Sequence, residues 1–181
     1  MLEDKRIHVF GASGAGTTTL GTALARQLSV PHFDVDDVYW RRTDPPFVEK
    51  YTPEQRLAAL DQGMAPLASW VLSGSLCGWG EVLVPSFTHT VFLHVEPGCR
   101  LQRLRRRERQ RHGDRILPGK DMHHIHTEFL AWAERYDNAG IEQRSKLLHQ
   151  RWSESLPCPI LRLDGDQSIG ELVDRVLHWL C

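Results

Sequence analysis

A glycine-rich segment near the start of the chain contains the residues whose types and spacing point most clearly to chemistry. It lies between a short apolar run and a stretch of helical periodicity, and it consists of Gly11, Ala12, Ser13, Gly14, Ala15, Gly16, Thr17, Thr18 and Thr19. Glycines let successive backbone N–H groups converge on an anion, and the following helix N-terminus adds partial positive charge there. The segment predicts a phosphate-binding loop for ATP, with the Thr18 hydroxyl placed to ligate Mg²⁺. A tight strand-to-helix turn is the alternative interpretation.

This loop departs from the usual phosphate-loop pattern at one position. The pattern G-x-x-x-x-G-K-[ST] has a lysine before the hydroxyl residue, and this sequence has Thr17 there. The missing ammonium removes a charge-assisted hydrogen bond to phosphate, which is worth about 1.5 to 3 kcal/mol. ATP binding is expected to survive this loss, whereas the rate of phosphoryl transfer is in question.

Two acidic residues, Asp34 and Asp36, follow the second apolar run. If that run is a strand, alternation aims both carboxylates the same way, at the edge where ligands bind in open α/β sheets. One of them, with Asp34 as the candidate, could hold Mg²⁺ through water while the other orients the substrate hydroxyl or accepts its proton. Alternatively, these acids cap and begin a helix at residues 38–40, and both roles could coexist.

A second glycine-containing loop, residues 73–80, follows the third apolar run and would lie on the same edge of the sheet. Its glycines could let a substrate approach the backbone closely. The loop has no acid that could serve as a second Mg²⁺ carboxylate, and a simple bend explains its glycines equally well.

An arginine-rich stretch concentrates positive charge in a chain whose formal net charge is −1. Residues 100–115 contain eight arginines and two acids, so this window sums to +6 and the remainder to about −7. Arg103, Arg107 and Arg111 share one helical face, which could fold over a triphosphate and stabilise charge on the transferring phosphoryl group. A solvated helix face and nucleic-acid binding are the alternatives. A sequence pI of about 6.8 and the lack of a recognisable nucleic-acid-binding motif argue against the second.

Other residue types exclude several classes of site. The four cysteines are widely spaced, which argues against a disulfide framework and a thiolate metal site. His124 and His126 are not at i, i+4 spacing, and no metal site is expected there. The sequence has no long apolar run and no secretory h-region, so a cytoplasmic protein without a membrane partner is expected.

Alternating strand-like and helix-like segments predict the elements that position these residues. Length and composition fit one α/β domain over residues 1–181. The candidate strands are residues 7–10, 32–34, 70–73, 90–95 and 160–163. The candidate helices follow Gly16, Thr52, Glu96, Asp121 and Ser168, and a further one spans about residues 141–152.

At these motifs the chain resembles the P-loop kinases of the adenylate kinase and shikimate kinase group. The resemblance covers nearly the whole length, through GASGAGTTTL, FDVDD, LSGS, LHVEPGCRLQRLRRRE and LRLDGD. The chain is also similar to uncharacterised bacterial adenylate-kinase-like proteins whose loop reads GT where lysine is expected. The group implies a three-layer αβα P-loop NTPase fold with a five-stranded parallel sheet of order 2-3-1-4-5. It further implies a substrate-binding segment at about residues 37–68 and a helical lid at about residues 105–125.

The resemblance also assigns roles position by position. The phosphate loop takes Gly11, Gly14, Gly16 and Thr18, and the D-x-D motif of shikimate-type kinases takes Asp34 and Asp36. Gly74 and Gly78 match the glycine loop loosely, Arg103 and Arg107 fall in the lid region, and Arg41, Arg42 or Arg56 could bind an acidic substrate.

Two functions therefore remain open. The first is a kinase that moves the γ-phosphoryl of MgATP to a nucleoside monophosphate or a hydroxyl metabolite, with Asp34 or Asp36 positioning the acceptor and Arg103 and Arg107 neutralising charge. The second is a nucleotide-binding protein with little or no kinase activity that serves as a regulatory or docking module. The sequence does not name the acceptor or the oligomeric state.

Overall fold

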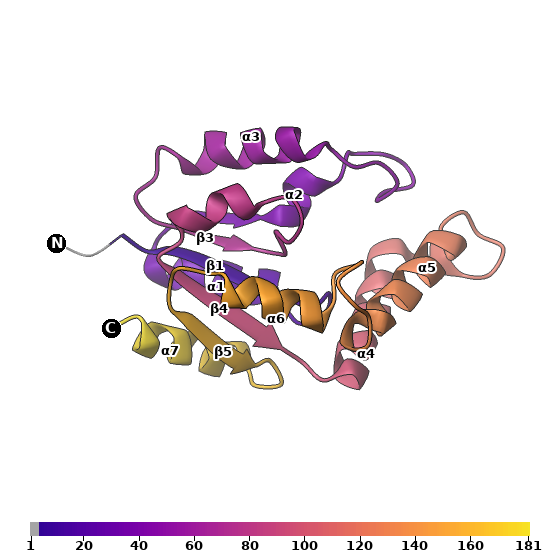
Figure 1. The fold of residues 1–181 in the computed structure, drawn as a ribbon. Coiled ribbons are helices and arrows are strands. Elements are labelled where there is room, and N and C mark those ends of the chain that lie inside the picture. The colour runs from indigo at the N-terminus through magenta and orange to yellow at the C-terminus, as the bar shows by residue number, and fades with distance from the viewer. Residues whose placement is uncertain (1–3) are drawn as a thin grey trace.

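A parallel sheet forms the centre of the computed structural model, which describes residues 4–181 (Figure 1). Its strands are β1 (Arg6–Gly11), β2 (His32–Asp34), β3 (Trp70–Ser73), β4 (His89–His94) and β5 (Ile160–Asp164), in the order β2-β3-β1-β4-β5. All four neighbouring pairs are parallel. This order confirms the predicted three-layer P-loop NTPase fold. Because β1 lies between β3 and β4, the loops that follow these three strands lie at one edge of the sheet.

Alternating side chains of the strands build one apolar core on each face of the sheet. Ile7 and Val9 of β1 pack with α1 (Thr17–Leu28) and α7 (Ile169–Trp179) on one face. Phe10 packs on the opposite face with residues of α3 (Pro53–Met64) and α6 (Lys146–Glu154). With both faces covered, the ends of the strands remain available for ligands.

Local signals in the sequence explain where several helices begin. A capping box between Thr52 and Gln55 starts α3, and a second one between Ser168 and Glu171 starts α7. The prediction for α6 was wrong by several residues: the helix starts at Lys146, because the Ser145 side chain caps it by accepting a hydrogen bond from the Leu148 N–H at 3.0 Å.

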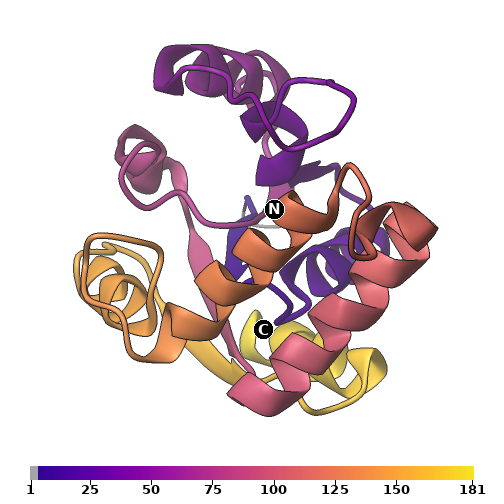
Figure 2. The same ribbon diagram turned by 90° about the vertical axis from the view of Figure 1, so that its right-hand side faces the viewer.

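A helical hairpin projects beyond the carboxyl ends of the strands (Figures 1 and 2). It contains α4 (Pro97–His112), the short helix η2 (Gly113–Ile116), α5 (His123–Glu134) and the short helix η3 (Arg135–Asp137). Leu101 and Leu104 of α4 pack against Ala133 of α5, so the arginine-rich helix has its own small apolar contact. Within residues 4–181, no helix combines the length and apolar character that a membrane span requires.

Candidate active site

The loop between β1 and α1 presents free backbone donors. The N–H groups of Ser13, Gly14 and Gly16 make no hydrogen bond to any acceptor in residues 4–181, while the Ala15 N–H closes a turn on the Ala12 carbonyl at 3.0 Å. Gly14 and Gly16 have φ angles of 83° and 99°, which favour glycine. The first turn of α1 adds further N–H groups without helical partners. These residues fit the phosphates of a nucleotide, as the sequence predicts.

The back of this loop is tightly packed, whereas its front is open. A methyl group at Gly14 would lie 2.8 Å from both the Arg100 carbonyl oxygen and Leu104 Cγ. A methyl group at Gly16 would meet only Leu93 Cδ2, at 3.9 Å. Thr18 and Thr19 are exposed at the start of α1. Gly14 therefore supports the loop from inside, and Gly16 faces the space available to a ligand.

Asp34 lies at the end of β2 and caps the short helix α2 (Val35–Tyr39). Its Oδ1 accepts the Asp36 N–H at 2.9 Å, and its Oδ2 accepts the Ser73 hydroxyl at 3.2 Å. The capping role is thus confirmed for Asp34. The alternation argument for Asp36 was wrong, because Asp36 belongs to α2 and not to the strand. The expected helix at residues 38–40 begins earlier, at Val35, because Asp34 caps it.

Asp36 is exposed to solvent in the first turn of α2. The surrounding protein removes part of the water that would hydrate its carboxylate, and this effect, together with the Asp34 charge, raises the Asp36 pKa. Arg144, Arg107 and Arg111 oppose the rise, in decreasing order. The positive charges of these three arginines therefore favour the ionised Asp36 carboxylate.

His32 is linked to Asp34 through Ser73, and the sequence interpretation did not single it out. Its Nε2 lies 2.9 Å from Ser73 Oγ, and the Ser73 hydroxyl donates to Asp34. Since that proton is used, His32 Nε2 is the donor to Ser73. Burial lowers the His32 pKa, against the opposing effect of Asp34 and Asp37. The signal in the sequence was its place on β2 two residues before Asp34, on the same side of the strand.

The two predicted lid arginines have different surroundings. Arg103 donates to the Gly165 carbonyl at 3.0 Å and lies 3.7 Å from Asp166, so the loop after β5 holds it. Arg107 lies 3.3 Å from Glu108 and over the Phe129 ring, and it also acts on Asp36. The structure therefore brings Arg107, but not Arg103, toward Asp36.

Two further arginines contact the phosphate loop, and no sequence motif selects them. Arg100 is fully buried; it donates to the Ala133 carbonyl and the Asp137 carboxylate at 2.8 Å each, and to the Ser13 carbonyl at 3.4 Å. Arg144, in the segment before α6, places Nη1 3.5 Å from Ser13 Oγ. Arg100 thus fixes the loop from behind, and Arg144 approaches the Ser13 side chain.

A buried cation lies in the predicted substrate-binding segment. Arg56 is only 7% exposed, with its guanidinium carbon 3.8 Å from the Tyr39 ring centroid and 5.3 Å from that of Trp79. Its buried Nε has no hydrogen-bond partner, and no acid in the described part of the chain pairs with it. By contrast, Arg41 and Arg42 are exposed. Arg56 is therefore the member of the predicted trio whose surroundings are suited to an anion.

The loop at residues 73–80 is fixed by packing and hydrogen bonds. A methyl group at Gly74 would lie 2.6 Å from Val35 Cβ, which supports the bend interpretation for this glycine. Ser75 Oγ lies 3.0 Å from His149 Nε2, whose Nδ1 is 2.9 Å from the Tyr136 hydroxyl. At Gly78, by contrast, a methyl group would meet no atom within 4 Å. The approach of a substrate along the loop remains a prediction.

Contacts also join the hairpin to the segment after α2. Arg115 of η2 lies 2.6 Å from Asp44 in an ion pair, and the Phe47 ring meets His112 edge-on at 6.1 Å. The hairpin and the segment therefore touch in this structure.

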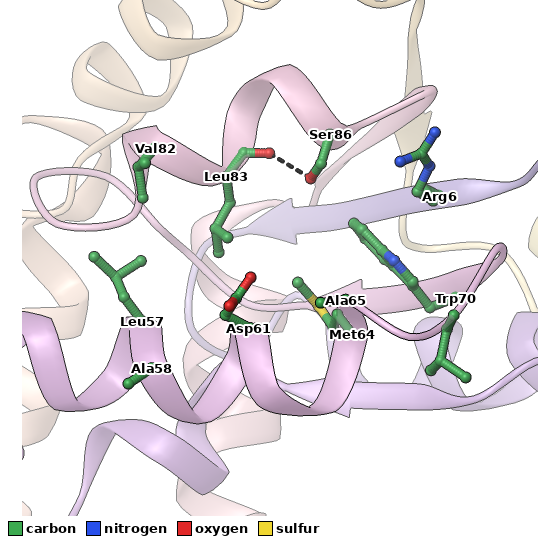
Figure 3. A pocket seen from close by; sticks show the side chains of 11 residues that line it. Arg6, Leu57, Ala58, Asp61, Met64, Ala65, Trp70, Val82, Leu83 and Ser86 are labelled. Atoms are coloured by element: carbon green, nitrogen blue, oxygen red, sulfur yellow. Dashed lines mark hydrogen bonds between the residues drawn. The ribbon is translucent and has the colours of Figure 1, made fainter.

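A separate groove of about 490 Å³ lies between α3 and the short helix η1 (Glu81–Ser86) (Figure 3). Leu57, Val82 and Leu83 line it, and Arg6 and Trp70 stand at the amino ends of their strands. Ligands in parallel α/β sheets bind at the carboxyl ends, so this groove is not the nucleotide site. No group of three or more His, Cys, Asp or Glu side chains between residues 4 and 181 could hold a metal. A magnesium site would thus depend on Thr18, Asp34 and the nucleotide itself.

Comparisons with known proteins place this geometry in a family. A family model described as an AAA domain matches residues 7–126. The uncharacterised protein YqaC of Bacillus subtilis is 44% identical over 176 residues, which is 97% of each chain. A shikimate kinase of Bacteroides thetaiotaomicron is 36% identical over 126 residues, covering 64% of this chain and 70% of the relative.

Solved structures agree on the fold. A shikimate kinase structure from Bacteroides thetaiotaomicron superposes with a TM-score of 0.54 at 24% identity, covering 97% of this chain and 98% of that one. Shikimate kinase from Acinetobacter baumannii in complex with shikimate gives 0.55 at 17% identity, with coverage of 97% and 92%. At such identities the likeness concerns the fold alone. The sequence matches, which cover more than half of its length, show that the chain belongs to the P-loop kinase family, among relatives that include the shikimate kinases.

Proposed function

We propose that the protein is a kinase that transfers the γ-phosphoryl group of MgATP to a small anionic acceptor. One observation carries the proposal: the free N–H groups of the phosphate loop, the carboxylates Asp34 and Asp36, and the arginines acting on Asp36 converge at the carboxyl edge of one sheet. Phosphoryl transfer depends mainly on positioning and on neutralising charge, and this arrangement provides both.

Each group then has a role. The N–H groups of Ser13, Gly14 and Gly16 bind phosphate oxygens, and Thr18 and Asp34 would hold Mg²⁺, which would neutralise phosphate charge. Asp36 orients the acceptor, and when the acceptor is a hydroxyl it accepts the proton. The acceptor oxygen forms a bond to Pγ as the bond between Pγ and the departing ADP oxygen breaks.

Arg56 supports an acceptor that carries negative charge. A guanidinium with 7% exposure has lost most of its hydration, and its contacts with the Tyr39 and Trp79 rings replace only part of it, without an anionic partner in an ion pair. A carboxylate or phosphate of the acceptor would be that partner, and Tyr39 and Trp79 would flank the bound group. Residues 37–68 would then bind the acceptor, and residues 105–125 would act as the lid over both substrates.

The second candidate function is a nucleotide-binding protein with little catalysis, acting through closure over ATP. Thr17 favours it, because the loop lacks the lysine that usually contacts the transferring phosphates.

ADP formation from MgATP with panels of nucleoside monophosphates, sugars and hydroxy acids separates the two functions. The kinase proposal expects one acceptor class to stimulate ADP release, and expects Arg56→Met to remove that stimulation while ATP still binds. ATP binding without stimulation by any panel member would favour the binding protein.

A further inference from the structure

We propose that Arg144 is the phosphate-binding cation of this site and replaces the lysine that is absent at position 17. Its guanidinium would contact the β- and γ-phosphates of ATP in place of the ammonium. The inference deepens the proposed function and rests on its nucleotide-binding part.

The position of Arg144 provides the first argument. Its Nη1 lies 3.5 Å from Ser13 Oγ, so the guanidinium stands beside the loop whose Ser13, Gly14 and Gly16 N–H groups are free. Arg144 forms no ion pair with any acid in the described range 4–181. Its charge is therefore available to an anion bound on the loop.

The other arginines near the site are engaged or remote. Arg100 is paired with Asp137, Arg103 with the Gly165 carbonyl and Asp166, and Arg107 with Glu108. Arg111 is exposed near the end of α4, and of the arginines acting on Asp36 it has the weakest effect. Arg144 has the strongest effect of the three, so its charge acts on both the Asp36 carboxylate and the neighbouring phosphate loop.

The support of Arg144 provides the second argument. Its guanidinium carbon lies 5.5 Å from the centroid of the Trp132 ring. The next residue, Ser145, is fully buried; its hydroxyl donates to the Gly140 carbonyl at 2.6 Å and accepts the Leu148 N–H that caps α6. The backbone at Arg144 is thus fixed to the body of the protein. A cation held this way is positioned before nucleotide binds, as the lysine of an ordinary phosphate loop would be.

Guanidinium chemistry suits the role. The planar guanidinium can donate two parallel hydrogen bonds to two phosphate oxygens. An ammonium lacks this fork geometry and interacts with phosphate as a point charge. Thr17 is half-buried and too short to compete for the same phosphate oxygens.

The test is a double-mutant cycle on nucleotide affinity, measured by calorimetry with MgATP and with MgADP. The variants are Arg144→Gln, Thr17→Lys and the double variant. Arg144→Gln should weaken MgATP binding by about tenfold or more and MgADP binding by less, because the γ-phosphate loses its cation. Thr17→Lys should improve MgATP affinity far more in the Arg144→Gln background than in the natural protein.

Arg151→Gln is the matched control: Arg151 is an exposed arginine on α6, and its loss should leave both affinities unchanged. Arg144→Lys keeps the charge and should recover part of the affinity, which a purely structural role would not require. Thermal unfolding of each variant identifies any that fails to fold, and if Arg144→Gln does not fold, Arg144→Met, which also removes the charge, replaces it in the cycle.

Additive effects of Thr17→Lys and the Arg144 substitution would overturn the inference, as would equal losses for MgATP and MgADP. If the natural protein and the Arg144→Gln variant bind MgATP equally well, the Arg144 assignment alone is refuted. Natural protein that binds no nucleotide would refute the proposed function together with it.

Discussion

Gly14 and Gly16 offer a sharp test of the phosphate loop, because they share a positive φ but have different surroundings. Alanine at Gly16 would suffer mainly backbone strain, since its nearest new contact is at 3.9 Å. An L-residue in the left-handed region costs about 1–2 kcal/mol. Alanine at Gly14 would add a collision at 2.8 Å with a backbone oxygen that cannot move freely, and overpacking of this kind costs about 1–3 kcal/mol more.

Substitutions at the two glycines should rank differently in their effects on ATP affinity and on the free energy of unfolding. A side chain at Gly16 would stand where the converging N–H groups meet the phosphates, so Gly16→Ala should weaken ATP binding and Gly16→Val should abolish it with the fold intact. Gly14→Ala should lower the free energy of unfolding by about 2–5 kcal/mol, the sum of the two costs above, against about 1–2 kcal/mol for Gly16→Ala.

Urea denaturation measures the stabilities, and calorimetry with MgATP measures the affinities of the folded variants. Equal stability of the two alanine variants would refute the packing argument at Gly14. Unchanged ATP affinity in Gly16→Val would show that the loop is not the nucleotide site.

Three further predictions concern separate parts of the molecule. Asp36→Asn should lower kcat more than ATP affinity in steady-state kinetics, because Asp36 acts after nucleotide has bound; an effect on binding alone would leave it a structural role in α2. Burial lowers the pKa of His8 to about 4 and that of His149 to about 3. The unfolded chain, with histidine pKa values near 6.5, therefore takes up protons first, and the free energy of unfolding should fall as pH decreases from about 6.5 to 4; a pH-independent urea midpoint over this range would contradict this. Arg115→Ala removes the exposed ion pairs with Asp44 and Asp121 and should leave the urea midpoint nearly unchanged, because exposed ion pairs contribute little to stability; a clear fall in the midpoint would contradict this.

The fold could be predicted because its signals are local and mutually consistent. Short apolar runs, capping boxes such as Ser168 with Glu171, and the glycine loop each specify one element. The family resemblance then supplied the strand order that the structure confirms. The start of α6 was harder to predict, because residues 141–144 have helical composition and only the capping hydrogen bond of Ser145 shows where the helix begins.

The candidate site could be predicted only where a motif marks the residue. The phosphate loop and the Asp34–Asp36 pair were visible as spacing, and their site roles stay predictions. His32 and Arg144 could not be recognised from spacing, because the contacts that bring them near the loop or Asp34 join segments far apart in the chain. The 3.5 Å approach of Arg144 to Ser13 is an example. For Arg56, the sequence showed a charge, but only the structure shows that it is buried beside two aromatic rings.

The buried Arg100 has a consequence for how this site can change during evolution. Its guanidinium joins the phosphate loop to Asp137 with no exposure to solvent, and removing one partner of a buried ion pair costs about 3–5 kcal/mol. Replacing Arg100 or Asp137 singly would therefore consume much of the stability of a typical domain. Among relatives, Arg100 and Asp137 should therefore be replaced together or not at all. Position 14 packs on the Arg100 backbone and should remain glycine wherever that backbone has the same position.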